Sequence, residues 1–238
     1  GRIHCLDLKS GSVVWSEDLR ARYGADKGFF GFACSPLVMA ERVVVGIGGR
    51  DGAGIVALSL ADGSLQWKAT GDEAGYASPT SADLGGAARA IFFTREGLRV
   101  LDPDSGQLLA SYPWRARLHS SVNAATPLVA ADRIFLSASY ETGAVVLEWT
   151  GDGVRPHWES DNSLSNHYAT SVMLGGVVFG FHGRQEYRPS LRCIELNSGR
   201  VLWSEDGFGA GTLLRADAQL LVMRETGELV LAEANSRA

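Results

Sequence analysis

Short runs of alternating apolar and polar residues, separated by turn residues, dominate the chain. Residues 3–15 consist of one such run, an acidic residue, a Ser-Gly pair and a second run that ends in Trp15. Alternation with a period of two predicts β-strands, and a glycine between two strands supplies the positive φ that a tight reversal needs. The chain is therefore expected to begin with two antiparallel strands.

The same pattern recurs along the whole chain. Residues 55–67 and 191–203 repeat it closely, and residues 98–110 and 145–158 repeat it more weakly. The turn glycines lie near positions 11, 63, 106, 153 and 199, and a spacing of about 47 residues is typical of propeller blades with four strands each. We therefore predict an all-β fold, a β-propeller of four-stranded antiparallel blades with about five repeats in this chain.

Three residue types recur at fixed places in the repeat. A tryptophan ends the outer strand, where a large flat ring can fill the wedge between neighbouring sheets. A glycine forms the turn, and an acidic residue four positions before it can accept hydrogen bonds from turn N–H groups. These structural repeat residues are Trp15, Trp67, Trp158, Trp203, Gly11, Gly63, Gly106, Gly199, Asp7, Asp102 and Glu195.

The chain starts and ends at the same point of the repeat. If five blades closed into a ring, residues 1–8 and 227–234 would compete for one strand position. Closed propellers use such an overlap once, to hide their strand edges. We therefore expect residues 1–238 to form a single propeller domain that is a segment of a larger propeller, with a complete five-bladed ring as the alternative.

Three local predictions concern the first complete blade. Residues 16–28 are expected to form a polar crossing, and residues 29–38 and 42–47 the inner pair of strands. The glycine-rich run 48–54 would need a following helix to cradle a phosphate. Because a strand follows instead, this run is expected to be a hairpin.

Composition and charge exclude several classes of protein. The net charge of −5 argues against a nucleic-acid partner, which would require a basic face. There is no run of eighteen apolar residues, so we expect no transmembrane segment. The chain also lacks an initiator Met and a signal peptide, and Gly1 leads straight into a strand. We expect residues upstream of Gly1 to be missing.

Reactive side chains form no catalytic or metal-binding motif in the sequence. The three cysteines lack zinc spacing, and the five histidines show neither HxH nor HExxH. His119 precedes Ser120 and Ser121, but without a nucleophile elbow this run is expected to be a solvated loop. The sequence therefore predicts no catalytic residue and no metal ligand.

The repeat resembles the tryptophan-docking motif of pyrroloquinoline-quinone-type propellers, Ala-x-Asp-x-x-(Ser/Thr)-Gly-x-x-x-Trp. Residues 5–15, 57–67 and 193–203 match it best, with Cys in place of Ala twice and Ser59 in place of Asp once. The chain is thus similar to the pyrroloquinoline-quinone-binding-like β-propeller repeat proteins. This resemblance implies eight blades and an extracytoplasmic location, in the periplasm or cell envelope of a bacterium.

The family that this chain resembles contains both enzymes and scaffolds. Its dehydrogenases carry two adjacent cysteines over the quinone and Glu, Asn and Asp ligands for Ca²⁺. In this chain Cys5, Cys34 and Cys193 are not adjacent, and no matching calcium motif can be placed. The resemblance therefore favours a cofactor-free, non-catalytic scaffold that binds protein partners, or copies of itself, through blade edges and loops. A pyrroloquinoline-quinone-dependent alcohol or sugar dehydrogenase with Ca²⁺ is the alternative.

Polar and aromatic residues in loops mark a candidate binding rim for a small ligand or a peptide. Loops that enter the innermost strands surround the central channel of a propeller, where ligands of this fold class bind. The alternative role of these residues is loop capping and packing between blades. The candidates are Phe29, Phe30, Tyr76, Asn123, Asn166, His167 and Tyr168 at inner strands, and His182 and Arg184 in a loop between an inner and an outer strand.

Overall fold

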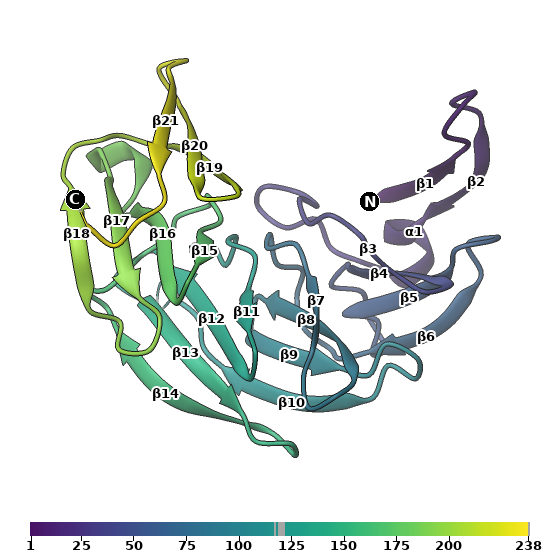
Figure 1. Ribbon diagram of the computed structural model, residues 1–238. Coiled ribbons are helices and arrows are strands. Elements are labelled where there is room, and N and C mark those ends of the chain that lie inside the picture. Colours follow the sequence, from purple (N-terminus) through teal and green to yellow (C-terminus); the bar gives the residue numbers. More distant parts are fainter. Residues whose placement is uncertain (117, 119–121, 238) are drawn as a thin grey trace. The chain divides into compact units, whose positions relative to one another are not determined.

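The computed structural model describes residues 1–116, 118 and 122–237. The chain divides into two compact units, Gly1–Pro113 and Trp114–Ala238. Almost all regular structure in both units is β-strand (Figure 1). The run from His119 to Ser121, expected to be a solvated loop, lies outside the described residues.

The first unit holds one two-stranded and two four-stranded sheets. Its elements are β1 (Arg2–Leu6), β2 (Val13–Asp18) and the short helix α1 (Leu19–Tyr23), then the sheet of β3 (Leu37–Met39), β4 (Arg42–Gly46), β5 (Ile55–Ser59) and β6 (Leu65–Ala69), and the sheet of β7 (Thr80–Asp83), β8 (Ala88–Thr94), β9 (Gly97–Leu101) and β10 (Leu108–Pro113). In each sheet, strands that are consecutive in the chain pair antiparallel.

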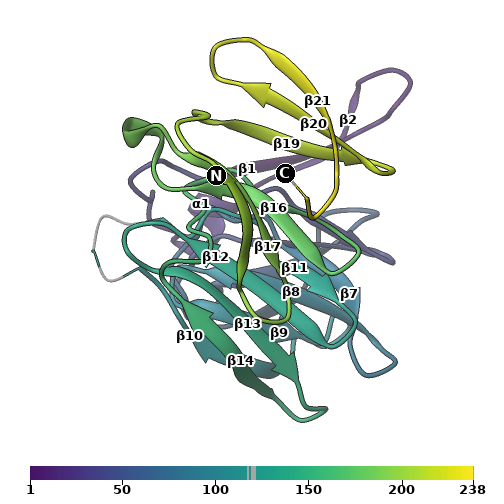
Figure 2. The same cartoon turned by 60° about the vertical axis from the view of Figure 1, so that its left-hand side comes forward.

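The second unit holds two four-stranded sheets and one three-stranded sheet, again with antiparallel neighbours. Its elements are β11 (Leu128–Ala130), β12 (Arg133–Ala138), β13 (Gly143–Trp149) and β14 (Val154–Ser160), then β15 (Val172–Leu174), β16 (Val177–His182), the 3₁₀ helix η1 (Gln185–Tyr187), β17 (Ser190–Glu195) and β18 (Val201–Glu205), and finally β19 (Gly211–Ala216), β20 (Gln219–Arg224) and β21 (Leu229–Glu233). Figures 1 and 2 both show the β15–β18 sheet beside the β11–β14 sheet. The predicted all-β fold of four-stranded antiparallel blades is confirmed.

In three of the repeats, the residue opposite the tryptophan is small. The pairs are Cys5 with Trp15, Ala57 with Trp67 and Cys193 with Trp203. The strand register shifts immediately after each small residue, as at a β-bulge, which bends the strand towards its turn. The repeat therefore encodes both a small site beside the indole ring and an irregularity that leads into the turn.

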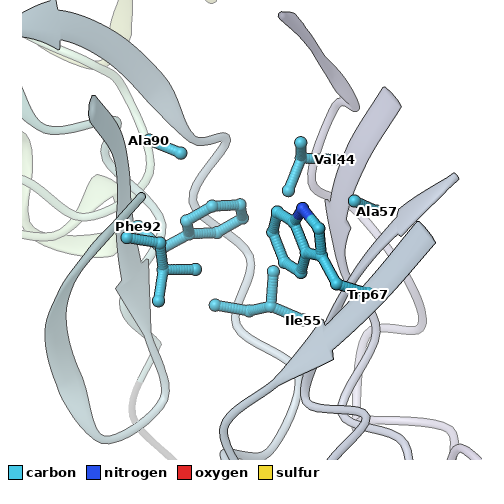
Figure 3. Close-up of a cluster of buried hydrophobic side chains, with 7 residues drawn as sticks. Val44, Ile55, Ala57, Trp67, Ala90 and Phe92 are labelled. Atoms are coloured by element: carbon cyan, nitrogen blue, oxygen red, sulfur yellow. The ribbon is translucent and has the colours of Figure 1, made fainter. Parts of the chain in front are cut away.

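Three repeat tryptophans, Trp15, Trp67 and Trp158, reach towards the sheet that follows them within their unit. The indole Nε1 donates to a carbonyl oxygen three residues before the next turn glycine: Trp15 to Leu60 (2.9 Å), Trp67 to Pro103 (3.0 Å) and Trp158 to Leu196 (2.7 Å). Trp67 packs with Val44, Ile55 and Phe92 in the core between the two four-stranded sheets of the first unit (Figure 3). The tryptophan thus joins successive sheets through both a hydrogen bond and apolar packing.

The repeat acids organise the turns. Asp7 Oδ1 accepts hydrogen bonds from the Ser10 N–H (2.8 Å) and the Ser10 hydroxyl (2.7 Å), and Asp102 makes the same two contacts with Ser105 at 2.9 Å each. The hydroxyl and N–H bonds from Ser10 hold the pKa of Asp7 below its ordinary value. Glu195 accepts from the Ser198 hydroxyl. Each acid therefore accepts hydrogen bonds from N–H or hydroxyl groups of a turn, which have no partner in a neighbouring strand.

Two local predictions for the first complete blade are wrong. Residues 16–28 are not only a polar crossing, because β2 continues to Asp18 and α1 follows it. Asp18 caps that helix by accepting from the Ala21 N–H at 3.0 Å, and Gly24 ends it in the left-handed conformation. Within residues 29–38 only the end is strand, since β3 begins at Leu37. The glycine-rich run 48–54 is the expected hairpin, closed by Gly48 N–H donating to Gly54 O at 3.0 Å.

The other inner strands also begin later than their first apolar residues suggest. β7 begins at Thr80, directly after a proline, and β15 begins at Val172. The polar groups ahead of them bond to a neighbouring loop rather than within the sheet: Ser78 Oγ accepts from Ser35 N and Thr170 Oγ1 accepts from Thr126 N, both at 3.0 Å. These bonds join equivalent loops of successive blades. The residues concerned therefore lie in loops, ahead of the inner strands.

Candidate functional site

Three loops of the second unit bring aromatic side chains together. Residues 139–142 join β12 to β13, residues 161–171 join β14 to β15, and residues 183–189 join β16 to β17. Ring and cation–π contacts link five side chains from these loops. We call this set the aromatic loop cluster: Tyr140, His167, Tyr168, Arg184 and Tyr187.

The cluster is arranged around the imidazole of His167. Its Nε2 lies 3.0 Å from the Tyr140 hydroxyl, and its ring meets the Tyr140 ring edge-on at 5.4 Å and the Tyr168 ring at 5.1 Å. The Arg184 guanidinium lies 4.7 Å from the Tyr140 ring centre and 5.6 Å from that of Tyr187. These edge-on and tilted contacts hold the rings and the guanidinium against one another.

Asn166 positions the loop that carries His167 and Tyr168. The residue is buried, with 1% of its surface exposed. Its side chain donates to Phe181 O at 3.1 Å and accepts from Ser171 Oγ at 2.9 Å, while its N–H donates to Ser137 Oγ at 2.8 Å. Phe181 and Ser137 lie on strands and Ser171 lies in the same loop, so Asn166 holds this loop against the sheets.

A small pocket opens beside the cluster, between the β15–β18 and β19–β21 sheets. It encloses about 220 Å³ of empty space, including space open to solvent. Its lining includes His167, Tyr168, Phe181, Gln185, Pro189 and Gly211. The Tyr168 hydroxyl donates to Gln185 Oε1 across this lining. The aromatic rings and the proline make the lining mostly apolar, and the enclosed space is only about large enough for one water molecule.

Burial shifts the pKa values of both His167 and Tyr168 towards their uncharged forms. Burial lowers the pKa of His167, an effect that the Arg184 charge increases and the Glu186 charge opposes. Burial raises the pKa of the Tyr168 hydroxyl. Near neutral pH both groups are therefore uncharged hydrogen-bonding groups. In the part of the chain that the structure describes, the Tyr140 hydroxyl is the one polar partner of the His167 ring.

The sequence-predicted rim residues lie in several separate places. His167, Tyr168 and Arg184 lie together in the cluster, and Asn166 supports them. Asn123 is buried in the same unit, with 1% of its surface exposed. Tyr76 belongs to the first unit, where its hydroxyl accepts from the Phe30 N–H at 3.2 Å.

Sequence reasoning missed Tyr140 and Tyr187. Each belongs to a hairpin loop between strands, not to a segment that enters an innermost strand. The signal available was the presence of tyrosine in tight turns: Tyr140 itself has a positive φ of 61°, and Tyr187 precedes Arg188 at 50°. Non-glycine residues adopt such values at a cost, and this strain accumulates at functional sites.

His182 lies at the end of β16, where it pairs with Ser190 of β17. Its Nδ1 is buried and makes no hydrogen bond within the described part of the chain. Burial lowers its pKa, the Arg192 charge lowers it further and the Asp206 charge opposes both effects, so that the pKa is about 4. The imidazole is therefore neutral at physiological pH.

We expect His182 to make the protein less stable as the pH falls from 6.5 towards about 4. In this window the unfolded state binds a proton at His182 while the folded state does not, so protonation favours unfolding. Partial exposure of the ring makes the loss smaller than for a fully buried histidine. Urea unfolding at pH 7 and pH 4.5 should show a smaller loss of stability for His182→Gln than for the parent protein. An equal loss in both proteins would contradict this assignment.

The residues that a quinone and Ca²⁺ would need do not come together in the described residues. The cysteines are free and belong to separate repeats, with Cys5 on β1 and Cys193 on β17. No three His, Cys, Asp or Glu side chains gather at one point among the residues that the structure describes. The amide of Asn166 is already engaged by Phe181 and Ser171.

A family model decides the relationship of this chain. The model for the outer membrane protein assembly factor BamB matches residues 1–205. The chain belongs to this family. A comparison of this BamB-family chain with curated proteins gives no match. None of the helices that the structure describes is long and apolar enough to span a membrane.

Solved structures share the fold of this BamB-family chain. BamB from Moraxella catarrhalis matches with a TM-score of 0.71 and 15% identity, over 98% of this chain and 70% of that one. The designed protein Ika8 matches with a TM-score of 0.63 and 13% identity, over 98% and 65% of the two chains. A europium-containing methanol dehydrogenase matches at 0.54 and 12% identity, over 85% of this chain and 51% of the enzyme. At these identities the matches establish the fold, and they include both an assembly factor and an enzyme.

Proposed function

We propose that this chain is a non-catalytic scaffold that binds other proteins in the bacterial cell envelope, in the periplasm. Its membership of the BamB family supports both the interaction role and the location. The observation that carries the proposal is the aromatic loop cluster with its adjoining pocket. Tyrosine and arginine are the residue types that dominate binding energy in protein interfaces.

The loops are held in place by the sheets beneath them. Asn166 secures one loop through Ser171 and Phe181. Gly180 of β16 has no room for a side chain, because a Cβ atom there would lie 2.1 Å from Ser171 Oγ. A surface that is ordered before binding loses little conformational freedom on association. Exposed Tyr168 and Tyr187 on such loops can therefore anchor a partner peptide.

We expect the double variant His167→Ala/Tyr168→Ala to lose partners that the parent protein retains. The change removes two rings and one wall of the pocket, and interface tyrosines cost at least about 2 kcal/mol, or about 30-fold in Kd, when truncated at hot spots. The measurement is affinity capture from a solubilised envelope fraction, quantified by mass spectrometry for the parent and the variant.

Val201→Ala is the matched control, because Val201 is a partly exposed apolar residue of β18 outside the cluster. It should retain every partner of the parent protein. If the double variant folds and still captures every partner with unchanged yield, the cluster is not the binding site.

A second candidate function is a quinone-dependent alcohol or sugar dehydrogenase, supported by the fold shared with methanol dehydrogenase. Its test is titration with pyrroloquinoline quinone and Ca²⁺, followed by tryptophan fluorescence. Stoichiometric quenching would support this alternative. Unchanged fluorescence would support the scaffold.

We also propose that residues 1–238 form one propeller domain of a larger, eight-bladed protein. The span of the family model, which covers residues of both compact units, supports this proposal. We propose, too, that the repeat tryptophans serve as docking residues between blades, as their Nε1 bonds to the next sheet suggest. Self-assembly through blade edges is a further form that the scaffold role could take.

A further inference from the structure

The loop between α1 and β3 presents two adjacent phenyl rings to solvent. Phe29 is 87% exposed and Phe30 is 63% exposed. They occupy the centre of a tight turn that Gly31 N–H closes by donating to Gly28 O at 3.0 Å. Turn centres usually hold Gly, Pro, Asn, Asp or Ser, each for a conformational reason that phenylalanine does not share. The local backbone therefore does not explain the two rings.

The core does not explain them either. Phe29 contacts the neighbouring Phe30 ring edge-on, with centroids 4.7 Å apart, and its exposure leaves it outside the core. Single exposed apolar residues are common on protein surfaces, whereas adjacent exposed aromatic residues mark interaction sites. Burial of this apolar area against a partner would be favourable.

The turn is held in position by residues beneath it. The Tyr76 hydroxyl accepts from Phe30 N–H at 3.2 Å, and the Tyr76 ring meets the Phe30 ring edge-on at 5.7 Å. Further along, Ser35 N–H donates to Ser78 Oγ at 3.0 Å. Because these contacts tie the loop to the segment before β7, the rings are presented with little freedom left to lose on binding.

The charges around the turn have both signs. The Asp26 carboxylate pairs with the Arg50 guanidinium at 3.4 Å. Lys27 follows Asp26 in the sequence and precedes the turn that carries the phenyl rings. The whole chain carries a net charge of −5. A turn that inserted into an anionic bilayer would be expected to have a basic surround. Charges of both signs beside an apolar turn instead suit the polar border and apolar centre of a protein interface.

We propose that Phe29 and Phe30 form an aromatic anchor that inserts into an apolar pocket of a folded partner protein. The pocket must accommodate two adjoining rings and be bordered by charged groups of both signs, to match Asp26, Lys27 and Arg50. This inference rests on the proposed scaffold role for the class of partner. It adds a contact surface on the first unit, separate from the aromatic loop cluster.

The test places the photo-crosslinking amino acid p-benzoylphenylalanine at position 29 of the full chain, and separately at position 30, in an envelope fraction. Position 38 is the control, because Val38 is 57% exposed on β3 outside the turn. We expect positions 29 and 30 to give the same discrete protein adduct and position 38 to give none. With that protein purified, Phe29→Ala should weaken its Kd by about 30-fold, Phe29→Leu by less, and Val38→Ala by less than about twofold.

Several results would overturn the inference. These are the absence of a discrete adduct at 29 and 30, an equal adduct at 38, or an unchanged Kd for a Phe29→Ala protein with an unaltered thermal unfolding midpoint. Binding to phosphatidylethanolamine–phosphatidylglycerol vesicles that Phe29→Ala/Phe30→Ala abolishes would assign the turn to a bilayer instead. If His167→Ala/Tyr168→Ala loses partners while the phenylalanine variants retain them, the scaffold role stands and this anchor fails. If neither set loses a partner, the scaffold role fails.

Discussion

Asp72→Ala is expected to destabilise the first unit by about 3 to 5 kcal/mol, because it removes one partner of a buried ion pair. Arg99 Nε and Nη2 donate to the two Asp72 carboxylate oxygens at 2.8 and 3.1 Å, and the Thr94 hydroxyl donates to one of them at 2.5 Å. The two charged side chains are only 10% and 13% exposed. Without the carboxylate, the guanidinium remains buried without its counter-charge. Urea unfolding of the parent and the variant measures the difference.

Two controls separate this effect from the loss of any surface charge. Asp26→Ala removes an ion pair of the same type whose side chains are 87% and 70% exposed, so a cost of no more than about 1 kcal/mol is expected. Asp72→Leu/Arg99→Met replaces both charges by apolar groups and should recover most of the lost stability. A small cost for Asp72→Ala, similar to that of Asp26→Ala, would show that water replaces the missing carboxylate.

Gly106→Ala is expected to cost about 2 to 5 kcal/mol. The residue has a φ of 74°, and a left-handed conformation costs a non-glycine residue about 1 to 2 kcal/mol. In addition, the new Cβ would lie 2.5 Å from the Trp67 ring, and overpacking of a core typically costs about 1 to 3 kcal/mol. Trp67 cannot easily retreat, because its Nε1 bonds to Pro103 O and its ring packs against Phe92 (Figure 3). Thermal and urea unfolding of the variant measure the sum.

Gly11→Ala is the matched control. Gly11 occupies the same turn of the repeat with a φ of 70°, but no atom lies within 4 Å of its added Cβ. Gly11→Ala should therefore lower the free energy of unfolding only by the cost of the left-handed backbone conformation, about 1 to 2 kcal/mol. Gly199→Ala, whose Cβ would lie 2.8 Å from Trp158, should resemble Gly106→Ala. Equal costs for Gly11→Ala and Gly106→Ala would mean that the indole contributes nothing to the requirement for glycine.

The candidate site was only partly predictable from the sequence. His167 and Tyr168 could be named because they directly precede an inner strand, and the position of that strand follows from the repeat. Tyr140 could not be named, since it lies 27 residues earlier and meets His167 only through the packing of two sheets. The pocket depends on Gly211 of the following sheet in the same way. Contacts between residues of different blades leave no pattern in the local sequence that could predict them.

The errors in strand boundaries have a related cause. Residues 29–36 contain enough apolar side chains to suggest a strand, yet they form a turn and a loop. A run of apolar residues predicts a strand on the assumption that its side chains are buried. The side chains of Phe29 and Phe30 are exposed, so the assumption fails here. The wrong prediction therefore falls on the segment that we infer to bind a partner. Disagreement between local pattern and structure is expected at functional sites.

By itself, the sequence determined the all-β class, the order of the strands, the turn positions and the repeat residues. These features depend on alternation, on glycine at the turns and on a spacing that any one blade contains. Only the tertiary structure decided that Trp67 lies on Gly106, that Asp72 pairs with Arg99, and that Tyr140 and His167 share one cluster. Those pairings join residues far apart in the chain, and their energies come from close packing and burial, which no local pattern encodes.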